Sequence, residues 1–322
     1  MANVKISADT AASTPIAGTA LIPIVQSGAN RTANVADIRN TPEPFVMTAQ
    51  ATGSVTAATA GSVKMFARSY AGRVMPEYMN EAAIDCFTQP ALFNNNFFMW
   101  CPASSTTTGQ MLGNAIGTAG TVSHPTLAST NMQTSMRRTQ WESAAAASSG
   151  AGIRGSMTQV WRGNAANMGG FFAVFRFSQN LNTLGHMAFV GLANSIAALT
   201  ANPSSLTNMI GLGFDSGDAV ASGWQLMRND ASGTATKVAL ASAPRDTSTV
   251  FTLSIYCPAN SSGITVRLYN DTAQSVILDN VTYTTDLPDS ATFLTFHAQQ
   301  YTGAITTACR FQLNRIYVES DI

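Results

Sequence analysis

The sequence predicts an all-β protein whose carboxyl-terminal half folds as an antiparallel sandwich of the jelly-roll kind. Short runs in residues 157–322 alternate apolar and polar side chains, which is the period of a β-strand with one buried face. Turn residues separate these runs at short, regular intervals, and convincing amphipathic helices are absent. Apolar residues make up 45% of the 322-residue chain, enough for a sizeable core. Together these observations favour a sandwich over any fold with interleaved helices.

The composition excludes several classes of partner. Only 11% of the residues are charged, and 17 basic residues balance 17 acidic ones. A neutral chain lacks the phosphate-neutralising charge that drives nucleic-acid binding, so no nucleic-acid partner is expected. Residues 1–10 lack a signal-peptide pattern, and the longest apolar stretch, 188–201, is shorter than the ~20 residues that a spanning helix needs. We therefore expect synthesis in the cytoplasm and no membrane insertion.

The first block, residues 1–40, predicts a small β-hairpin anchor. Residues 4–6 and 21–26 are strand-like, and Pro23 favours an edge position for the second of these runs. The turn signal at 27–30 predicts a hairpin, and a helical turn is expected at 35–38. So few apolar side chains cannot offset the entropy of folding. This block is therefore expected to dock on a partner or to oligomerise.

The second block, residues 41–156, is expected to be a β-rich connecting and trimerisation region. Residues 48–62 are of low complexity and indicate a linker or an extended edge, whereas 63–76 fit two short strands. We expect a loop at 104–120 and a second low-complexity bridge at 143–152. Four aromatic residues of this block pack either across a three-fold axis or in an intramolecular core: Phe93, Phe97, Phe98 and Trp100.

The third block, residues 157–322, is expected to be the sandwich head. Residues 171–177 are nearly all apolar and suit a central strand buried on both faces. Residues 250–257 and 264–269 alternate and are joined by a turn at 261–263, which predicts a hairpin. In the last strand the apolar phase changes, which predicts a β-bulge near residues 314–315.

Motifs for catalysis or for cofactor binding are absent from the sequence. It has no phosphate-binding loop, no zinc-protease motif and no nucleophile elbow, so we expect no enzyme, no catalytic residue and no cofactor. The cysteines are too scattered for a disulfide framework, and Cys257 and Cys309 are expected in the core. His186 and His297 lie in or beside apolar strands and are expected to be structural, so no metal site is predicted.

Two pairs of acidic residues and one tryptophan deserve a separate test. The pairs Asp215/Asp218 and Asp286/Asp289 lie in turns, where carboxylates usually cap the backbone. The alternatives are a Ca²⁺ or sugar contact at the sandwich rim and, last, catalysis. Trp224 has Arg228 nearby and is either a core residue or the stacking face of a sugar site. The candidate glycan-binding residues are Trp224, Asp215, Asp218 and Arg228.

Two stretches carry a resemblance to a known family. Residues 4–7, 15–28, 31–32 and 35–38 resemble the amino-terminal pattern KIS…LTG.E.VPVVQ.G…T..V.DI that opens many structural proteins of tailed-bacteriophage virions. Ala20 replaces the usual acidic residue of that pattern, and isoleucines replace two valines. Residues 63–75, with the Asp and Gln-Pro that follow at 85–90, are similar to a block of phage fibre-like proteins. The strand rhythm of the last block and its close at 310–318 resemble the lectin-type, concanavalin-like sandwiches that often end such fibres.

The resemblance implies a homotrimeric virion component that is attached to other virion proteins through residues 1–40. Its carboxyl-terminal head would bind a glycan or protein of the host surface. The attachment residues would be the apolar ones of the first block: Val4, Ile6, Leu21, Ile22, Ile24 and Val25. Two alternatives stay open: a purely structural decoration, collar or baseplate protein, and a tailspike-type depolymerase. No repeat of 20–50 residues supports the depolymerase.

Overall fold

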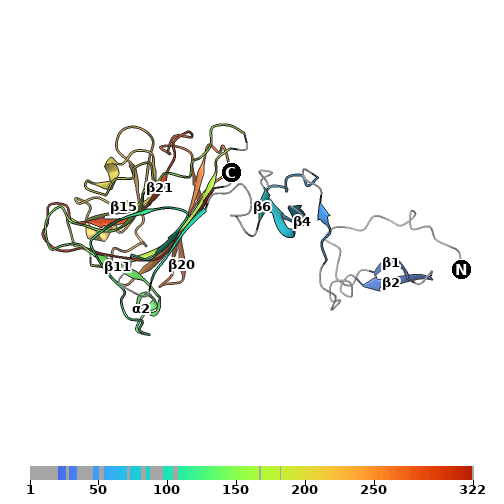
Figure 1. Cartoon of the computed structure of the whole chain (residues 1–322), viewed down its shortest axis with the longest axis horizontal. Helices are drawn as coiled ribbons and strands as arrows, with labels where there is room; N and C mark the ends of the chain where they lie inside the picture. The colour runs from blue at the N-terminus through green and yellow to red at the C-terminus, as the bar shows by residue number, and fades with distance from the viewer. Residues whose placement is uncertain are drawn as a thin grey trace.

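The computed structural model describes residues 21–26, 29–34, 46–50, 54–70, 73–80, 85–87, 97–103, 108–166, 168–181 and 183–320. Within these ranges the regular secondary structure is almost entirely β-strand, which confirms the predicted all-β class. Figure 1 shows three β units in chain order: a hairpin, a small sheet and a large carboxyl-terminal sandwich. No helix among the described residues is long and apolar enough to cross a membrane.

The amino-terminal hairpin pairs β1 (Leu21–Gln26) with β2 (Ala29–Asn34). Gln26 faces Ala29 across the turn, so the predicted hairpin is confirmed. The expected strand at residues 4–6 and the helical turn at 35–38 lie outside the described residues. The structure describes the backbone pairing of β1 but not its side chains. The attachment role of its apolar residues therefore stays a prediction.

The small sheet has four strands in the order β3-β4-β5-β6. Tyr70 of β4 (Lys64–Tyr70) faces Arg73 of β5 (Arg73–Met79), which confirms the two strands expected within residues 63–76. β3 (Ala49–Gln50) runs parallel to β4, and β6 (Asp85–Phe87) is antiparallel to β5. The extended edge at the start of the low-complexity segment 48–62 is therefore confirmed at β3.

The sandwich packs a nine-stranded sheet against a seven-stranded sheet. The nine-stranded sheet follows the order β10-β11-β22-β13-β18-β19-β20, and β7 and β8 continue from β22. Its strands are β7 (Phe97–Cys101), β8 (Gln110–Leu112), β10 (Thr121–Ser123), β11 (Thr139–Glu142), β13 (Phe171–Leu181), β18 (Val250–Cys257), β19 (Ile264–Asn270), β20 (Ser275–Tyr283) and β22 (Arg310–Ser320). Because β22 is long, β11 and β7 pair one after the other along the same strand.

The seven-stranded sheet follows the order β17-β16-β15-β14-β21-β12-β9. Its strands are β9 (Ile116–Ala119), β12 (Gly150–Gly155), β14 (Met187–Ala193), β15 (Met209–Phe214), β16 (Gln225–Asn229), β17 (Thr236–Ala239) and β21 (Thr295–Tyr301). Short helical turns lie outside the sheets at α2 (Met132–Ser135), η3 (Pro203–Ser205) and η4 (Val220–Ser222). The predicted antiparallel sandwich is thus confirmed.

The sandwich begins well before the boundary expected between residues 156 and 157. Strands β7 to β12 all lie in its two sheets, so that boundary is wrong. The loop expected at 104–120 contains β8 and β9, and the bridge expected at 143–152 ends in β12. β8 has only three residues, and β9 contains Gly and Thr. Both become strands by pairing with β7 and β12, and not through an apolar alternation of their own.

Aromatic side chains fill the space between the two sheets. Phe98 and Trp100 are buried there, with the Phe98 ring 5.5 Å from that of Phe296 and the Trp100 ring 5.6 Å from that of Trp141. The structure therefore places these two residues in an intramolecular core and not at a three-fold axis. Phe97 is half-buried on the opposite face of β7, and Phe93 lies outside the described residues.

Two of the strand predictions in the third block are confirmed and one is wrong in part. β18 and β19 form the expected hairpin, and the bulge lies at Asn314, which β13 skips between Leu313 and Arg315. β13 is central, between β22 and β18, but it is not buried on both faces. Phe172 and Val174 lie on its outer face, where the described residues of the sandwich leave them half-buried.

The buried cysteines and histidines are structural, as expected. Cys257 and Cys309 are free and buried, and burial raises the pKa of the Cys309 thiol to about 11. His186 accepts a hydrogen bond at Nδ1 from the Thr183 amide (2.9 Å) and donates from Nε2 to the Thr307 carbonyl (2.9 Å). His297 donates from Nε2 to the Ser195 carbonyl (2.6 Å). Burial lowers the pKa of both imidazoles below the ordinary 6.5.

Because of these two buried histidines, we expect the fold to lose stability in mild acid. The unfolded chain takes up a proton at each imidazole near pH 6.5, whereas the folded chain resists it. Keeping these imidazoles neutral therefore costs the fold nothing above pH 6.5. Below pH 6.5 the free energy of unfolding falls, by at most ~1.4 kcal/mol per pH unit for each histidine. Denaturant titrations at pH 7.5, 6.5, 5.5 and 4.5 measure this slope. A free energy of unfolding that is constant over that range would contradict it.

Candidate functional site

The outer face of the nine-stranded sheet presents an ordered array of side chains. Strand alternation turns Phe171, Ala173 and Phe175 into the core and leaves the residues between them on the outside. Because the strands are in register, the outward residues line up in three rows that run towards β19, two of them from β7 and the third from β22. The rows are Phe97, Glu319, Phe172, Tyr256 and Thr265; Met99, Tyr317, Val174, Ser254 and Arg267; and Arg315, Arg176, Thr252 and Tyr269.

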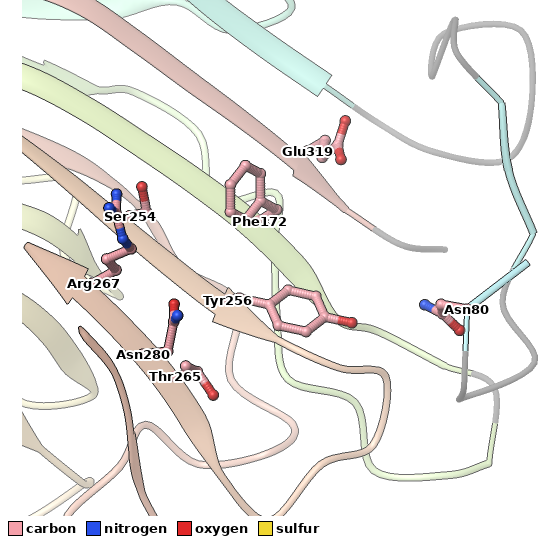
Figure 2. A pocket seen from close by; sticks show the side chains of 8 residues that line it. All are labelled: Asn80, Phe172, Ser254, Tyr256, Thr265, Arg267, Asn280 and Glu319. Carbon is pink, nitrogen blue, oxygen red and sulfur yellow. The ribbon is translucent and has the colours of Figure 1, made fainter. Parts of the chain in front are cut away.

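A pocket of about 530 Å³ lies over one end of this face. Its lining residues come from β13, β18, β19, β20, β22 and the residue that follows β5: Phe172, Ser254, Tyr256, Thr265, Arg267, Asn280, Glu319 and Asn80. Figure 2 shows the Phe172 ring between Glu319 and Tyr256, with Arg267, Thr265 and Asn280 on the neighbouring strands. The Phe172 and Tyr256 rings meet edge to face, with centroids 6.4 Å apart. We refer to these eight residues as the aromatic pocket.

Charged groups border the aromatic pocket on two sides. The Arg267 guanidinium lies 5.3 Å from the centre of the Tyr269 ring, and its Nε is 3.8 Å from Asp279 Oδ1. On the opposite side the Tyr317 hydroxyl donates to Glu319 Oε2. The pocket therefore offers a guanidinium donor and a carboxylate acceptor on either side of an aromatic floor.

A β-bulge shapes the wall of the pocket at β20. Val266 faces Val281 and Leu268 faces Leu278, so that Asp279 and Asn280 together oppose the single residue Arg267. Asn280 adopts a φ of 53°, a left-handed conformation that asparagine tolerates better than most residues. Bulges commonly re-aim side chains beside binding sites. Here the bulge places Asp279 against Arg267 and Asn280 in the pocket lining.

The chemistry of this pocket suits a ligand rich in hydroxyl groups. Aromatic faces pack against the C–H groups of a sugar ring, while guanidinium, carboxylate, amide and hydroxyl groups bond its hydroxyls. Among the described residues, no group of three or more His, Cys, Asp or Glu side chains is arranged to hold a metal ion.

The outer face of the seven-stranded sheet is covered by the chain itself. The segment 194–208 crosses it, and three side chains of the sheet hold this segment by its backbone. His297 donates to the Ser195 carbonyl, Arg154 Nε donates to the Ile196 carbonyl (2.8 Å), and Gln299 Oε1 accepts from the Leu199 amide (3.1 Å). A second apolar cluster, which includes Phe189, Met209 and Met227, is buried on this side. The candidate binding surface is therefore the face of the nine-stranded sheet.

Trp224 does not line a sugar site. Its side chain is 1% exposed and packs between Phe177 and Phe214, with ring centroids 5.1 and 4.9 Å away. An indole buried between the two sheets cannot stack on a ligand. Of the two interpretations of this residue, the core tryptophan is the one the structure shows, and the glycan-binding prediction for Trp224 is wrong.

Asp215 and Asp218 come together, but around Lys237 and not around an open site. Lys237 Nζ lies 3.0 Å from Asp215 Oδ2 and 2.7 Å from Asp218 Oδ1. Asp218 Oδ2 also accepts from the Asp215 amide (2.8 Å), and Asp215 Oδ1 accepts from the Ser204 amide (3.1 Å). Burial is the largest single effect on the pKa of Asp218 and raises it, but the hydrogen bonds from Lys237, the Asp215 amide and Gln225, together with the Lys237 charge, outweigh burial and lower that pKa below 3.8. These carboxylates therefore stabilise their own loop, as expected if they cap its backbone.

Arg228 is likewise occupied. Its guanidinium donates to the Thr285 carbonyl (2.9 Å) and to Asp286 Oδ2 (3.2 Å), and it lies 4.9 Å from the centre of the Tyr283 ring. Neither Arg228 nor the two aspartates lines the aromatic pocket. Sequence reasoning thus missed the pocket residues. The sequence did carry a signal for them: the polar and aromatic residues at alternate, outward positions of the strands, in particular Phe172, Tyr256 and Arg267.

Comparisons with known proteins found similarity at the level of the fold. No protein-family model matches the chain, and the search of curated proteins found no match. The chain is similar to peanut lectin solved with a nine-residue peptide, with 13% identity, a TM-score of 0.46, and coverage of 71% of this chain and 98% of that one. For lectin UEA-II complexed with galactose, the identity is 16%, the TM-score 0.40 and the coverage 70% and 93%. For a legume lectin-like domain from Entamoeba histolytica, these values are 12%, 0.37, and 61% and 87%.

Proposed function

We propose that this protein is a receptor-binding fibre component of a tailed-phage virion and that its sandwich binds a host-surface glycan in the aromatic pocket. The aromatic pocket is the observation that carries the proposal. It joins two aromatic rings to hydroxyl, amide, guanidinium and carboxylate groups on an open face of the sheet. In the same proposal residues 1–40 attach the chain to other virion proteins, and the chain assembles as a homotrimer. Three sites per fibre would then gain avidity from their linkage.

The attachment role of the first block is supported by its pairing. β1 and β2 form a two-stranded sheet of their own, and an isolated hairpin is at best marginally stable in water. An edge of this kind can add to the strands of a neighbouring protein. The sequence resemblance to virion attachment segments lies in the same residues.

The alternative of a purely structural virion protein shares this attachment but assigns no ligand to the sandwich. A depolymerase has less support, because the Asp215 and Asp218 carboxylates both contact Lys237 and cap their own loop. The aromatic pocket is therefore the feature that separates the leading proposal from the structural alternative.

Substitution of Tyr256 by alanine tests the proposal. We expect the full-length chain to bind at least one polysaccharide on an array of bacterial surface glycans, and we expect Tyr256→Ala to weaken that binding about tenfold or more, since ~1.4 kcal/mol of lost contact is a factor of ten. Phe293→Ala is the matched control, because Phe293 is an exposed aromatic residue (45%) outside the pocket. Circular dichroism confirms that each variant is folded.

Three results decide between the candidates. Loss of binding in Tyr256→Ala with retention in Phe293→Ala supports the proposal. Equal binding by wild type and folded Tyr256→Ala overturns the pocket assignment. Binding to none of the glycans by any form overturns the receptor-binding proposal in favour of a structural virion protein, whose position antibody labelling of particles would then show.

A further inference from the structure

Three arginines converge on a second pocket of the same sheet face. This pocket has a volume of about 300 Å³, and its lining includes Arg137, Arg176, Arg315, Asn314 and Cys101. Arg137 precedes β11, whereas Arg176 and Arg315 belong to the adjacent strands β13 and β22. The whole chain has only 17 basic residues and a net charge of zero, so a group of three arginines is a marked local excess. We refer to it as the arginine pocket.

The arrangement places like charges side by side. Arg176 and Arg315 are direct register partners on the outward face, and like charges in that relation destabilise a sheet. Asp271 binds Arg176 at 3.0 Å and is held from its other oxygen by the Thr252 hydroxyl (2.7 Å). Within the described part of the chain, no carboxylate pairs with Arg137 or Arg315. Counting the described residues alone, the pocket therefore keeps an uncompensated positive charge.

Local backbone structure maintains this arrangement. The β-bulge in β22 inserts Asn314 beside Arg315, and Asn314 Nδ2 donates to the Arg137 carbonyl (3.0 Å). This hydrogen bond ties the segment that carries Arg137 to β22, an interior strand of the nine-stranded sheet. A bulge that positions side chains from two segments around one hollow is a common feature of binding sites.

The two pockets lie on the same strands at a fixed spacing. Phe172 of the aromatic pocket and Arg176 of the arginine pocket are four residues apart on β13, as are Glu319 and Arg315 on β22. Four residues of strand span about 13 Å, which is the scale of a short oligosaccharide. Val174 and Tyr317 are the half-buried residues between them and face each other across the two strands.

We propose that the arginine pocket binds the anionic group of the same glycan, a carboxylate or phosphate carried by an acidic oligosaccharide whose uncharged ring packs in the aromatic pocket. Guanidinium groups match the planar geometry of carboxylates and phosphates and bind them with paired hydrogen bonds. An anion between Arg176 and Arg315 also removes their mutual repulsion. This inference rests on the proposed function and narrows its ligand to acidic surface polysaccharides.

Calorimetric titration of the full-length chain tests the inference, with inorganic phosphate, glucuronate and uncharged glucose as probes. We expect phosphate and glucuronate to bind more tightly than glucose and to bind about tenfold more weakly in Arg315→Gln. Arg310→Gln is the matched control, because Arg310 lies on the same strand but pairs with Glu142 at 2.8 Å outside the pocket. In phosphate-free buffer Arg315→Gln should melt at the same temperature as wild type or higher, since it removes a like-charge contact.

The glycan array supplies the second arm, with uronic-acid, phosphorylated and neutral polysaccharides compared. Preference for either acidic class that disappears in Arg315→Gln supports the inference and identifies which anion is used. Binding to neutral glycans alone, with loss in Tyr256→Ala and none in Arg315→Gln, overturns the inference and leaves the proposed function standing. Phosphate binding that needs Arg315 without any glycan binding supports an anion site but overturns the receptor function. A folded Arg315→Gln that binds both anions as wild type does overturns the anion site.

Discussion

Replacement of Trp224 by alanine is expected to lower the free energy of unfolding by about 3–5 kcal/mol, the range for large aromatic residues removed from a core. The indole fills the space between the two sheets and contacts Phe177 and Phe214, which are themselves fully buried. A cavity of that size cannot be closed without moving both sheets, because interiors are tightly packed. Denaturant unfolding of purified wild type and variant, followed by circular dichroism, measures the difference.

Trp224→Phe is the control for this prediction. It keeps a ring at the centre of the cluster and removes an indole N–H that has no hydrogen-bond partner among the described residues. We therefore expect a loss well below that of alanine, because removal of an unpaired buried donor offsets part of the lost contact. If Trp224→Ala were as stable as wild type but lost glycan binding, Trp224 would be a ligand residue and its core assignment would be wrong.

Replacement of Lys237 by methionine is expected to cost about 2–4 kcal/mol. The change keeps the aliphatic chain but leaves Asp215 and Asp218 without the ammonium group that both contact. Their side chains are only 11% and 18% exposed, so water can solvate the unpaired carboxylates only in part. Removing one partner of such an ion pair is destabilising because the remaining charge stays buried without compensation. Urea denaturation at pH 7 measures the change.

Two comparisons isolate the charge effect of Lys237. Lys64→Met removes an exposed lysine whose hydrogen bonds to described residues go to the Thr56 carbonyl and hydroxyl, and it should change stability by less than ~0.5 kcal/mol. Adding Asp218→Asn to Lys237→Met should restore part of the loss, since it removes one of the two unpaired charges. A double variant that is no more stable than Lys237→Met would contradict the electrostatic explanation.

The sequence predicted the sandwich best where apolar alternation is regular. The β18–β19 hairpin follows from the alternating apolar residues of 250–257 and 264–269, and the phase change in β22 located the bulge at Asn314. It failed for β8, β9 and β12, which contain Gly, Thr and Gln and become strands through their partners. Short strands of this kind are fixed by tertiary pairing, which no local pattern encodes.

The candidate site was harder to predict because its residues come from strands that are distant in the sequence. Phe172, Tyr256 and Arg267 meet only when β13, β18 and β19 adopt their register. The predicted residues were close together in sequence instead. Trp224 follows a loop that contains two aspartates, but burial decides its role, and neither neighbouring residues nor spacing reveals that burial.

The structure of the full-length chain with its best-bound array glycan tests the central claim most directly. The account predicts a sugar ring against Phe172 and Tyr256 on the outer face of the nine-stranded sheet, with hydrogen bonds to Arg267 or Glu319. A glycan seated instead on the seven-stranded sheet, over the segment 194–208, or on the loop of Asp215 and Asp218 would contradict it.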